Sequence, residues 1–350
     1  MKMTTIDNLT AVLHKKGDMR LEQRPIPVPK DNEVLVRIES VGICGTDVHL
    51  LAHGSVAGFI VEKPTVVGHE ASGIVDKIGK NVKNLKPGDR VAIEPGVPCR
   101  TCTFCKTGKY NICPDLKLCS IPPTNGNLTR YYTHAADFCH KIPDNVSLDE
   151  AAVLEPLSVA VHACRRGNIQ VGDIVLILGA GPIGLVTLLA AKAMGALNIV
   201  VVDIIDKKLE KAKELGATHI INSKINTNVK RHLLELLNDL PNKTMDCVGA
   251  EATIRLGIEV TRPGGSLVGI GLAADEVKIP IAYAFSREIN IIGVFAYCHD
   301  YPIALELVAS GNVNVKPLIT HHYNLEETLE AFETARTGRG NAIKVLIHPK

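Results

Sequence analysis

Two short glycine-rich segments, 42–49 and 68–73, carry the residues best suited to chemistry. Cys44 lies in the first segment, and His69 and Glu70 are neighbours in the second. A thiolate, an imidazole and a carboxylate suit a borderline-soft metal ion such as zinc, and three protein ligands leave one tetrahedral position open. The pattern therefore predicts a catalytic metal site. The simpler alternative is a buried cysteine near a histidine in a turn.

Four further cysteines form a second cluster. They are separated by two, two and seven residues, and they are Cys99, Cys102, Cys105 and Cys113. Four thiolates make a closed tetrahedral shell, which is typical of a structural zinc with no room for substrate. A set of unligated thiols is the alternative. The remaining cysteines, Cys119, Cys139, Cys164, Cys247 and Cys298, lack metal-ligand spacing, and we expect them to be small buried residues.

A third pattern is typical of dinucleotide binding. Residues 173–178 form an apolar strand, 179–184 read Gly-Ala-Gly-Pro-Ile-Gly and open a helix, and a second apolar strand ends at Asp203. In this context the glycines let the backbone approach a pyrophosphate at a helix N-terminus, and the acid binds the ribose. A plain strand-to-helix turn is the alternative. Because a carboxylate repels a 2′-phosphate, Asp203 favours NAD over NADP.

Glu155 is an acidic residue in an apolar segment that should be buried. An isolated carboxylate is costly to bury unless something pairs with it. A metal ion or its bound water could be that partner, and a carboxylate at the start of a helix is an equally good interpretation.

The elements that must position these residues fall into two groups. From about Thr10 to Ile93 short alternating strands are punctuated by glycine and proline, which indicates a β-rich domain with the metal ligands on its loops. From Gly172 strands alternate with helices and give six strands, enough for one doubly wound parallel sheet. Two helices and a last strand follow, and we expect them to return to the first domain. The predicted fold is α/β, with a β-rich catalytic domain at 1–154 and 296–350 and a Rossmann domain at 155–295.

The composition argues against nucleic-acid binding and against a membrane span. A length of 350 residues suggests two domains, each with its own hydrophobic core. The 39 basic and 37 acidic residues leave a net charge of only +2. Charge runs are absent, aromatic residues make up 4% and tryptophan is missing, so a nucleic-acid partner is not expected. The N-terminal segment 1–7 lacks the apolar core of a signal peptide, which predicts a cytoplasmic protein with reduced thiols. The apolar run 174–191 contains the glycine turn, so we interpret it as strand, turn and helix rather than a membrane span.

Taken together, the motifs resemble the zinc-dependent medium-chain dehydrogenases, and most closely the sorbitol (polyol) dehydrogenases, over nearly the whole chain. The segments that carry the resemblance are 42–49, 68–73, 155–158, 162–166, 179–184 and 314–318. The resemblance implies a GroES-like β-rich domain, one catalytic and one structural zinc, and a homotetramer. It also implies NAD-dependent oxidation of a polyol or related secondary alcohol to the ketone, in which zinc makes the bound alcohol more acidic.

The resemblance also implies roles for single residues. Cys44, His69 and Glu70 match the catalytic zinc ligands, and Glu155 matches a carboxylate that contacts the bound water, the substrate or the metal. Thr46 and His49 match a proton relay, although ordinary loop chemistry would also account for them. The matches to NAD contacts are Gly179, Gly181, Ile183, Gly184, Asp203, Lys208, Ile270, Gly271, Leu272, Val294, Phe295 and Ala296. The substrate positions are Glu155, Tyr297 and Leu50.

Three positions depart from the pattern of sorbitol dehydrogenases. Leu50 replaces a usual tyrosine, and Ser55 and Ala296 replace usual arginines. Losing hydrogen-bond donors weakens polyol binding and relaxes the rejection of less oxygenated alcohols. The alternative substrates are therefore a less hydroxylated secondary alcohol, a diol or an amino alcohol. An alternative of another class is a non-catalytic NAD(H)-binding protein with a structural or sensing role; the complete set of metal and relay residues speaks against it.

Overall fold

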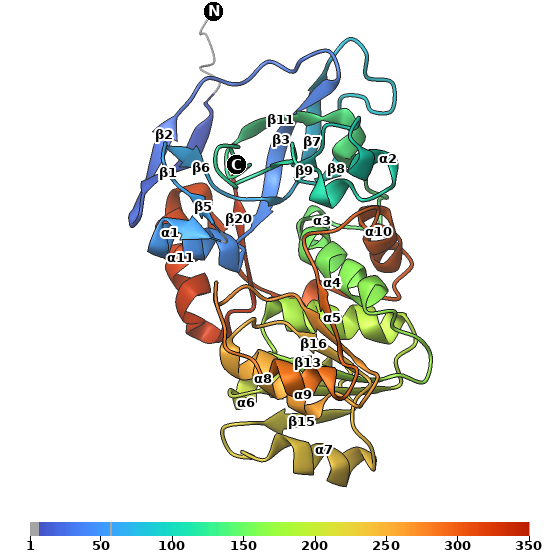
Figure 1. Ribbon diagram of the computed structural model, residues 1–350. Coiled ribbons are helices and arrows are strands. Elements are labelled where there is room, and N and C mark those ends of the chain that lie inside the picture. The colour runs from blue at the N-terminus through green and yellow to red at the C-terminus, as the bar shows by residue number, and fades with distance from the viewer. Residues whose placement is uncertain (1–6, 57, 350) are drawn as a thin grey trace, which may run out of the picture. The chain divides into compact units, whose positions relative to one another are not determined.

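The computed structural model describes residues 7–56 and 58–349 (Figure 1). The chain divides into two compact units, the first formed by residues 1–155 and 315–350 and the second by 156–314. Of the N-terminal segment used to predict the compartment, only Asp7 lies within the described residues. Within the described ranges, no helix is both long and apolar enough to cross a membrane.

A seven-stranded sheet is the centre of the first unit. Its strands run in the order β12-β8-β7-β3-β20-β19, and β11 also pairs with β3. The bounds are β3 Glu33–Gly42, β7 Glu70–Ile78, β8 Arg90–Ile93, β11 Tyr131–Ala135, β12 Cys139–Lys141, β19 Ile319–Asn324 and β20 Lys344–His348. The C-terminal strand β20 thus pairs antiparallel with β3 and parallel with β19, which returns the end of the chain to the first unit.

Smaller strands and short helices complete this unit. A three-stranded sheet in the order β2-β1-β6 is formed by β1 Leu9–Lys15, β2 Asp18–Gln23 and β6 Thr65–Val66. Two short pairs are β4 Ser55–Val56 with β5 Phe59–Ile60, and β9 Gly96–Val97 with β10 Lys117–Leu118. The helices are α1 Gly45–His53, α2 Thr103–Lys106, α3 Leu148–Ala152, α11 Thr328–Thr337, and the start of α4 Leu154–Arg166. One apolar core joins the alternate positions Val34, Val36 and Ile38 of β3 with Leu13 and Phe332.

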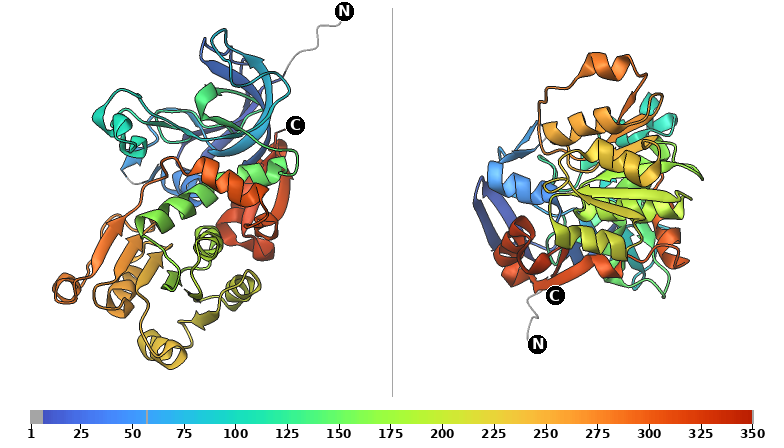
Figure 2. Two further views of the ribbon diagram at one scale, coloured as in Figure 1. Left: turned by 90° about the vertical axis from the view of Figure 1, so that its right-hand side faces the viewer. Right: turned by 90° about the horizontal axis from the view of Figure 1, so that it is seen from below.

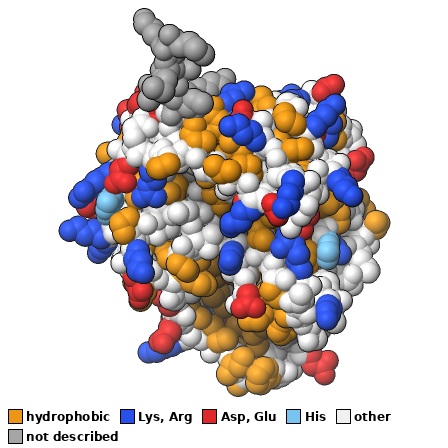
Figure 3. Space-filling view, turned by 90° about the horizontal axis from the view of Figure 1, so that it is seen from above, with side chains coloured by type: hydrophobic (Ala, Val, Ile, Leu, Met, Phe, Trp, Pro, Cys, Tyr) orange, Lys and Arg blue, Asp and Glu red, His pale blue; other side chains and the backbone are white. Residues whose placement is uncertain are grey.

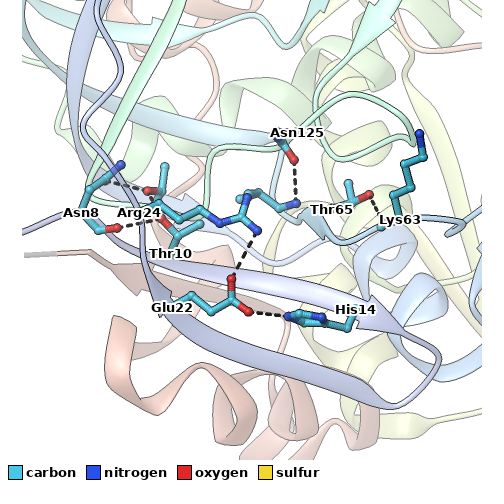
Figure 4. A network of polar contacts seen from close by, with 10 residues as sticks. Asn8, Thr10, His14, Glu22, Arg24, Lys63, Thr65 and Asn125 are labelled. Atoms are coloured by element: carbon cyan, nitrogen blue, oxygen red, sulfur yellow. Dashed lines mark hydrogen bonds and ion pairs between the residues drawn. The ribbon is translucent and has the colours of Figure 1, made fainter.

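Polar contacts hold the small sheet in place (Figure 4). Glu22 on β2 contacts the imidazole of His14 on β1 and accepts from Arg24 at 3.4 Å. The side chain of Asn125 accepts a hydrogen bond of 3.0 Å from the backbone N–H of Val66. These contacts satisfy polar groups at the sheet edge.

Seen from above, basic and acidic side chains are interspersed over the visible surface (Figure 3).

The second unit contains a six-stranded parallel sheet in the order β15-β14-β13-β16-β17-β18, the order of a doubly wound dinucleotide fold. Its strands are β13 Ile174–Leu178, β14 Asn198–Asp203, β15 His219–Asn222, β16 Lys243–Asp246, β17 Ser266–Gly269 and β18 Asn290–Gly293. Its helices are α5 Pro182–Ala193, α6 Asp206–Glu214, α7 Val229–Leu237, α8 Glu251–Val260, α9 Ile281–Phe285 and α10 Tyr301–Ala309. Helices cover both faces of this sheet (Figure 2). The six predicted strands are all present.

The second unit extends to residue 314, later than the boundary at 296 predicted from the sequence. The physical reason is Asp300, which is fully buried. It accepts hydrogen bonds from Arg165 at 2.5 Å and from the Cys298 N–H at 2.9 Å, and it pairs with His162 at 2.8 Å. These contacts fasten the segment that begins α10 to α4, so the unit ends only after α10.

Candidate metal centre and dinucleotide site

The start of α1 positions the first predicted metal ligand. Cys44 has extended backbone angles and is the residue immediately before the helix. Thr46 and His49, three residues apart, share one face of α1 and are partly exposed, whereas Asp47 and Leu50 are buried. Both residues are helical rather than in a loop, and their relay role stays a prediction.

The structure brings the three predicted catalytic ligands together. Cys44, His69 and Glu70 each offer one ligand atom, and these atoms lie within 4.8 Å of one another. Cys44 and His69 lie outside helices and strands as expected, but Glu70 is the first residue of β7 and pairs in register with Gly42 of β3. A Cβ atom at Gly42 would lie 2.1 Å from Glu70 Oε2, so glycine is required there to give the carboxylate its place. The donor set of sulfur, nitrogen and oxygen suits zinc.

The carboxylate of Asp47 faces the Nδ1 side of the His69 imidazole. Its Oδ2 lies 3.4 Å from His69 Nδ1, while its Oδ1 accepts from Ser120 Oγ at 2.5 Å and from the Gly68 N–H at 3.1 Å. Because Nδ1 faces this carboxylate, Nε2 is the nitrogen left to bind a metal. Burial lowers the pKa of His69, but the charges of Asp47 and Cys44 outweigh it and hold this pKa well above its usual value. The pocket therefore attracts a cation.

Lys344 is an unpredicted part of this site. It lies on β20, is 3% exposed, and its Nζ donates to Glu70 Oε1 at 2.8 Å, to Glu70 Oε2 at 2.6 Å and to the carbonyl of Ile43 at 3.2 Å. Burial lowers its pKa, but the charges of Glu70, Cys44 and Glu155 outweigh burial and raise the pKa above its usual value. The ammonium thus stays charged and offsets the negative charge collected around the metal position.

Glu155 lies in the first turn of α4 and is 7% exposed. Its charge contributes to the raised pKa of Lys344, so it lies near the Glu70–Lys344 pair. The three-ligand cluster consists of Cys44, His69 and Glu70. A direct bond from Glu155 to zinc therefore stays a prediction, as does its contact with substrate.

The four clustered cysteines converge as expected of a structural zinc site. The Sγ atom of Cys102 lies 3.5 Å from that of Cys105 and 3.8 Å from that of Cys113, and the Sγ atoms of Cys99 and Cys105 are 3.9 Å apart. Sulfur atoms around a tetrahedral zinc, with bonds of about 2.3 Å, lie about 3.8 Å apart. Hydrogen bonds from Thr101 and from the Cys102 N–H lower the pKa of Cys99 to about 6, which favours the thiolate that binds metal.

In the second unit, the three glycines of the fingerprint play distinct parts. Gly179 has a φ of +94°, which allows the tight turn after β13. A Cβ at Gly184 would lie 1.8 Å from the Gly179 carbonyl, so this glycine lets α5 pack closely on the turn. A Cβ at Gly181 would meet nothing within 4 Å, which leaves room for a phosphate at the N-terminus of α5. The loop fits a dinucleotide.

Asp203 ends β14 beside this turn. Its Oδ2 accepts from the Ala180 N–H at 2.7 Å, and its Oδ1 accepts from the N–H groups of Ile204 and Ile205 at 2.7 and 3.0 Å. The carboxylate is thus fixed next to the glycine turn, with acceptor capacity left for ribose hydroxyls. Lys208 is partly exposed in the first turn of α6.

Of the remaining predicted NAD positions, Ile183 is the second residue of α5, and the others lie at the ends of two neighbouring strands of the parallel sheet. Residues Ile270, Gly271 and Leu272 follow β17, and Val294, Phe295 and Ala296 follow β18. Since ligands of doubly wound folds bind beyond the carboxyl ends of the strands, this placement agrees with a cofactor role.

Two of the predicted substrate positions, Leu50 and Tyr297, are buried. Leu50 is 1% exposed and belongs to the apolar core of the first unit. Tyr297 is 3% exposed, and its ring packs edge-on against Tyr301 with centroids 5.5 Å apart. Ala296 adopts a left-handed conformation with a φ of +47°. Ala296 is a predicted NAD contact, and the substrate roles of Glu155, Leu50 and Tyr297 stay predictions.

Sequence reasoning missed Asp47, Ser120 and Lys344. Asp47 belongs to the same motif as Cys44, but acidic residues are common in the first turn of any helix, with or without a metal site nearby. Lys344 could have been recognised more easily than Asp47, because it is a charged residue in an otherwise apolar terminal strand. A buried lysine requires an anionic partner.

Known proteins share both the sequence and the fold described above. A model of the alcohol dehydrogenase GroES-like domain matches residues 30–144, and a model of zinc-binding dehydrogenases matches 182–310. Human sorbitol dehydrogenase is 52% identical over 345 residues, covering 98% of this chain and 97% of its own.

Two solved bacterial structures share the fold. An Escherichia coli oxidoreductase of unknown specificity has a TM-score of 0.93 and 37% identity, covering 98% of this chain and 99% of its own. The 2R,3R-butanediol dehydrogenase of Bacillus subtilis has a TM-score of 0.90 and 27% identity, covering 98% of this chain and 100% of its own.

A β-rich unit with metal ligands and a parallel-sheet unit with a dinucleotide fingerprint define an oxidoreductase that uses both cofactors. The chain belongs to the zinc-dependent medium-chain dehydrogenases, in the group that resembles sorbitol dehydrogenase. The predicted fold class, enzyme class and cofactors, zinc and NAD, are thereby confirmed.

Proposed function

We propose that this enzyme oxidises a polyol or a related secondary alcohol to the ketone, with transfer of hydride to NAD and release of one proton. The observation that carries the proposal is the cluster of partly buried Cys44 with buried His69 and Glu70, together with its charge-balancing Lys344. It occurs in a chain 52% identical to human sorbitol dehydrogenase. Zinc held by these ligands would supply Lewis-acid chemistry that makes the alcohol more acidic, and NAD would accept the hydride.

The residues of the chain prepare the reaction. Asp47 orients His69, and Gly42 gives Glu70 its position. Thr46 and His49 share a partly exposed face of α1, which supports a route for the alcohol proton to solvent. In the second unit, Asp203 would accept the ribose hydroxyls, which favours NAD over NADP.

The first test is the rate of NADH formation by the zinc-replete protein. Sorbitol and xylitol are compared with butane-2,3-diol and threonine, and NADP replaces NAD in parallel. We expect turnover of polyols with NAD, and at most weak turnover with NADP. Turnover of the diol or of threonine alone would replace the polyol with the less hydroxylated alternatives, and no turnover with any compound at full zinc content would favour the non-catalytic alternative.

Leu50, Ser55 and Ala296 motivate the second candidate, a less hydroxylated substrate. Leu50 lies in the core, so a tyrosine there would require repacking. Ser55 is partly buried on β4 and Ala296 already has a left-handed backbone, so arginine can be introduced at both positions without a new backbone conformation. The double variant Ser55→Arg and Ala296→Arg should raise kcat/KM for sorbitol relative to butane-2,3-diol. An unchanged ratio would contradict a role for the missing donors in substrate choice.

We also propose that the enzyme is a homotetramer in the cytoplasm. The support lies in the second unit, where β18 is the last strand of its sheet and several apolar side chains are exposed: Ile281, Tyr283, Phe285, Ile291 and Phe295. An open strand edge with apolar neighbours suits pairing with a second copy. Light scattering should give four times the chain mass, and Phe285→Asp should lower it; a monomeric wild type would contradict the proposal. None of the ten cysteines, all of which lie in the described residues, forms a disulfide, in keeping with a reducing compartment.

A further inference from the structure

A second group of metal-ligating side chains lies on the first unit, separate from the residues described above. His322 lies on β19, His348 ends β20, and Asp149 lies in the first turn of α3. His348 pairs in register with Asn324, two residues from His322 on the same exposed face of β19. The two imidazoles are therefore diagonal neighbours held by adjacent strands. Their rings are nearly parallel, with an interplanar angle of 11° and centroids 5.2 Å apart.

The hydrogen bonds fix which nitrogen can act as a ligand. His348 Nδ1 lies 3.0 Å from the carbonyl oxygen of Glu39. A carbonyl can only accept, so Nδ1 carries the proton and the lone pair lies on Nε2. This Nε2 lies 2.9 Å from His322 Nδ1. A backbone carbonyl that holds the far nitrogen of an imidazole is the usual support of a metal-bound histidine.

Asp149 completes the group. Its Oδ2 lies 3.9 Å from His322 Nδ1 and its Oδ1 lies 3.8 Å from His348 Nδ1. One ligand atom from each of the three residues lies within 4.8 Å of the others. Ligand atoms around a tetrahedral zinc, with bonds of about 2.0–2.1 Å, are about 3.3–3.4 Å apart. The distance from Asp149 Oδ2 to His322 Nδ1 exceeds this spacing by about half an ångström, and the two imidazole nitrogens lie closer than it by about the same amount. The contact of Asp149 with His348 involves Nδ1, the nitrogen that carries the proton, so side-chain rotation is needed to bring the carboxylate toward Nε2.

The backbone around the three residues is firmly held. Ser147 and Glu150 form a capping box at the start of α3, with bonds of 2.9 and 3.2 Å. Glu150 Oε2 also lies 3.8 Å from Lys316 Nζ, just before β19. The side chains of Asp149, His322 and His348 are 34%, 50% and 24% exposed, so an ion can enter from solvent and keep water in its remaining positions.

We propose that Asp149, His322 and His348 form an accessory site for a divalent transition-metal ion, with zinc as the leading occupant. Two imidazoles and one carboxylate are donors that suit zinc and also copper(II), nickel(II) and cobalt(II), whereas magnesium and calcium prefer oxygen ligands. Bound metal would join α3, β19 and the terminal strand β20. Because β20 also carries Lys344, the same ion would restrain the strand that supports the catalytic cluster.

The test measures Zn²⁺ uptake by the full chain whose other two sites are already loaded. We expect wild type to bind one additional equivalent at low micromolar free Zn²⁺, with a rise in its thermal midpoint. His322→Ala should bind this equivalent at least about tenfold more weakly. His321→Ala is the matched control, because His321 is the adjacent residue on the opposite face of β19, and it should bind like wild type.

A second readout covers the case in which a variant alters folding. Cu²⁺ bound to the accessory site should show two nitrogen ligands by paramagnetic resonance in wild type and one in His322→Ala and in His348→Ala. Far-ultraviolet circular dichroism verifies that each variant is folded. Equal Zn²⁺ affinity in wild type and His322→Ala, or binding only at millimolar Zn²⁺, would overturn the proposal.

Discussion

The Lys344–Glu70 pair gives the sharpest test of how the metal centre is built. Replacement of Lys344 by Met keeps a similar volume and removes the ammonium, so the Glu70 carboxylate, 1% exposed, loses both of its bonds to Nζ. Breaking one partner of a buried ion pair costs about 3–5 kcal/mol, because the other charge stays buried and unpaired. The ratio of folded to unfolded protein should therefore fall by roughly two to three and a half powers of ten.

Urea unfolding measures this change in protein whose four-cysteine site is loaded and whose catalytic site is metal-free, because zinc bound to Glu70 would itself compensate the carboxylate charge. The metal content of each variant is counted. The control is Lys80→Met, which breaks an exposed pair in which Lys80 Nζ lies 2.9 Å from Asp31, with side chains 74% and 56% exposed. An exposed pair contributes about 0–1 kcal/mol, so this variant should unfold nearly like wild type. If Lys344→Met lost less than about 1 kcal/mol, similar to the control, the buried charge of Glu70 would not depend on Lys344 and the reasoning would be refuted.

The remaining predictions concern other parts of the chain. Cys105→Ser should reduce the zinc content of the protein by one equivalent, measured by atomic emission, while the catalytic zinc is kept; retention of both ions would contradict the four-thiol site. Gly181→Ala should leave the melting temperature unchanged and weaken NAD binding, whereas Gly184→Ala should destabilise the fold, since its Cβ would lie 1.8 Å from a carbonyl. Titration calorimetry and thermal melting separate these two effects, and equal melting temperatures would contradict the packing role. Burial raises the pKa of Asp300, but bonds from His162, the Cys298 N–H and Arg165 outweigh it and lower this pKa. The ionised Asp300 carboxylate should therefore stabilise the fold fully above its pKa in the unfolded chain, about 4. This stabilisation should disappear as the pH falls through the lower pKa of Asp300 in the folded protein. The free energies of unfolding of wild type and Asp300→Asn should therefore differ at pH 7 and converge in acid; a constant difference would contradict the linkage.

Local patterns allowed much of the fold to be predicted. The six parallel strands follow from apolar runs and glycine turns, which depend on residues close in the chain. Cys99, Cys102, Cys105 and Cys113 likewise converge over a short segment.

Most of what escaped prediction depends on contacts between distant residues, and helix α1 is the exception. Lys344 and Glu70 are separated by 274 positions, and only the pairing of β20 with β3 brings them together. The unit boundary was misplaced for the same reason, because Asp300 is fastened by residues 135 and 138 positions away. Helix α1 was missed because its short sequence begins with glycine and threonine, which are weak helix formers.

The central claim is that the cluster of Cys44, His69 and Glu70 holds the metal on which alcohol oxidation depends. The most direct measurement is NADH formation from sorbitol by wild type and by His69→Ala, with the zinc content and NAD affinity of both determined. We expect the variant to lose one zinc and nearly all turnover while it keeps the four-cysteine zinc and its NAD affinity. Undiminished NADH formation by a His69→Ala protein that lacks this zinc would contradict the claim.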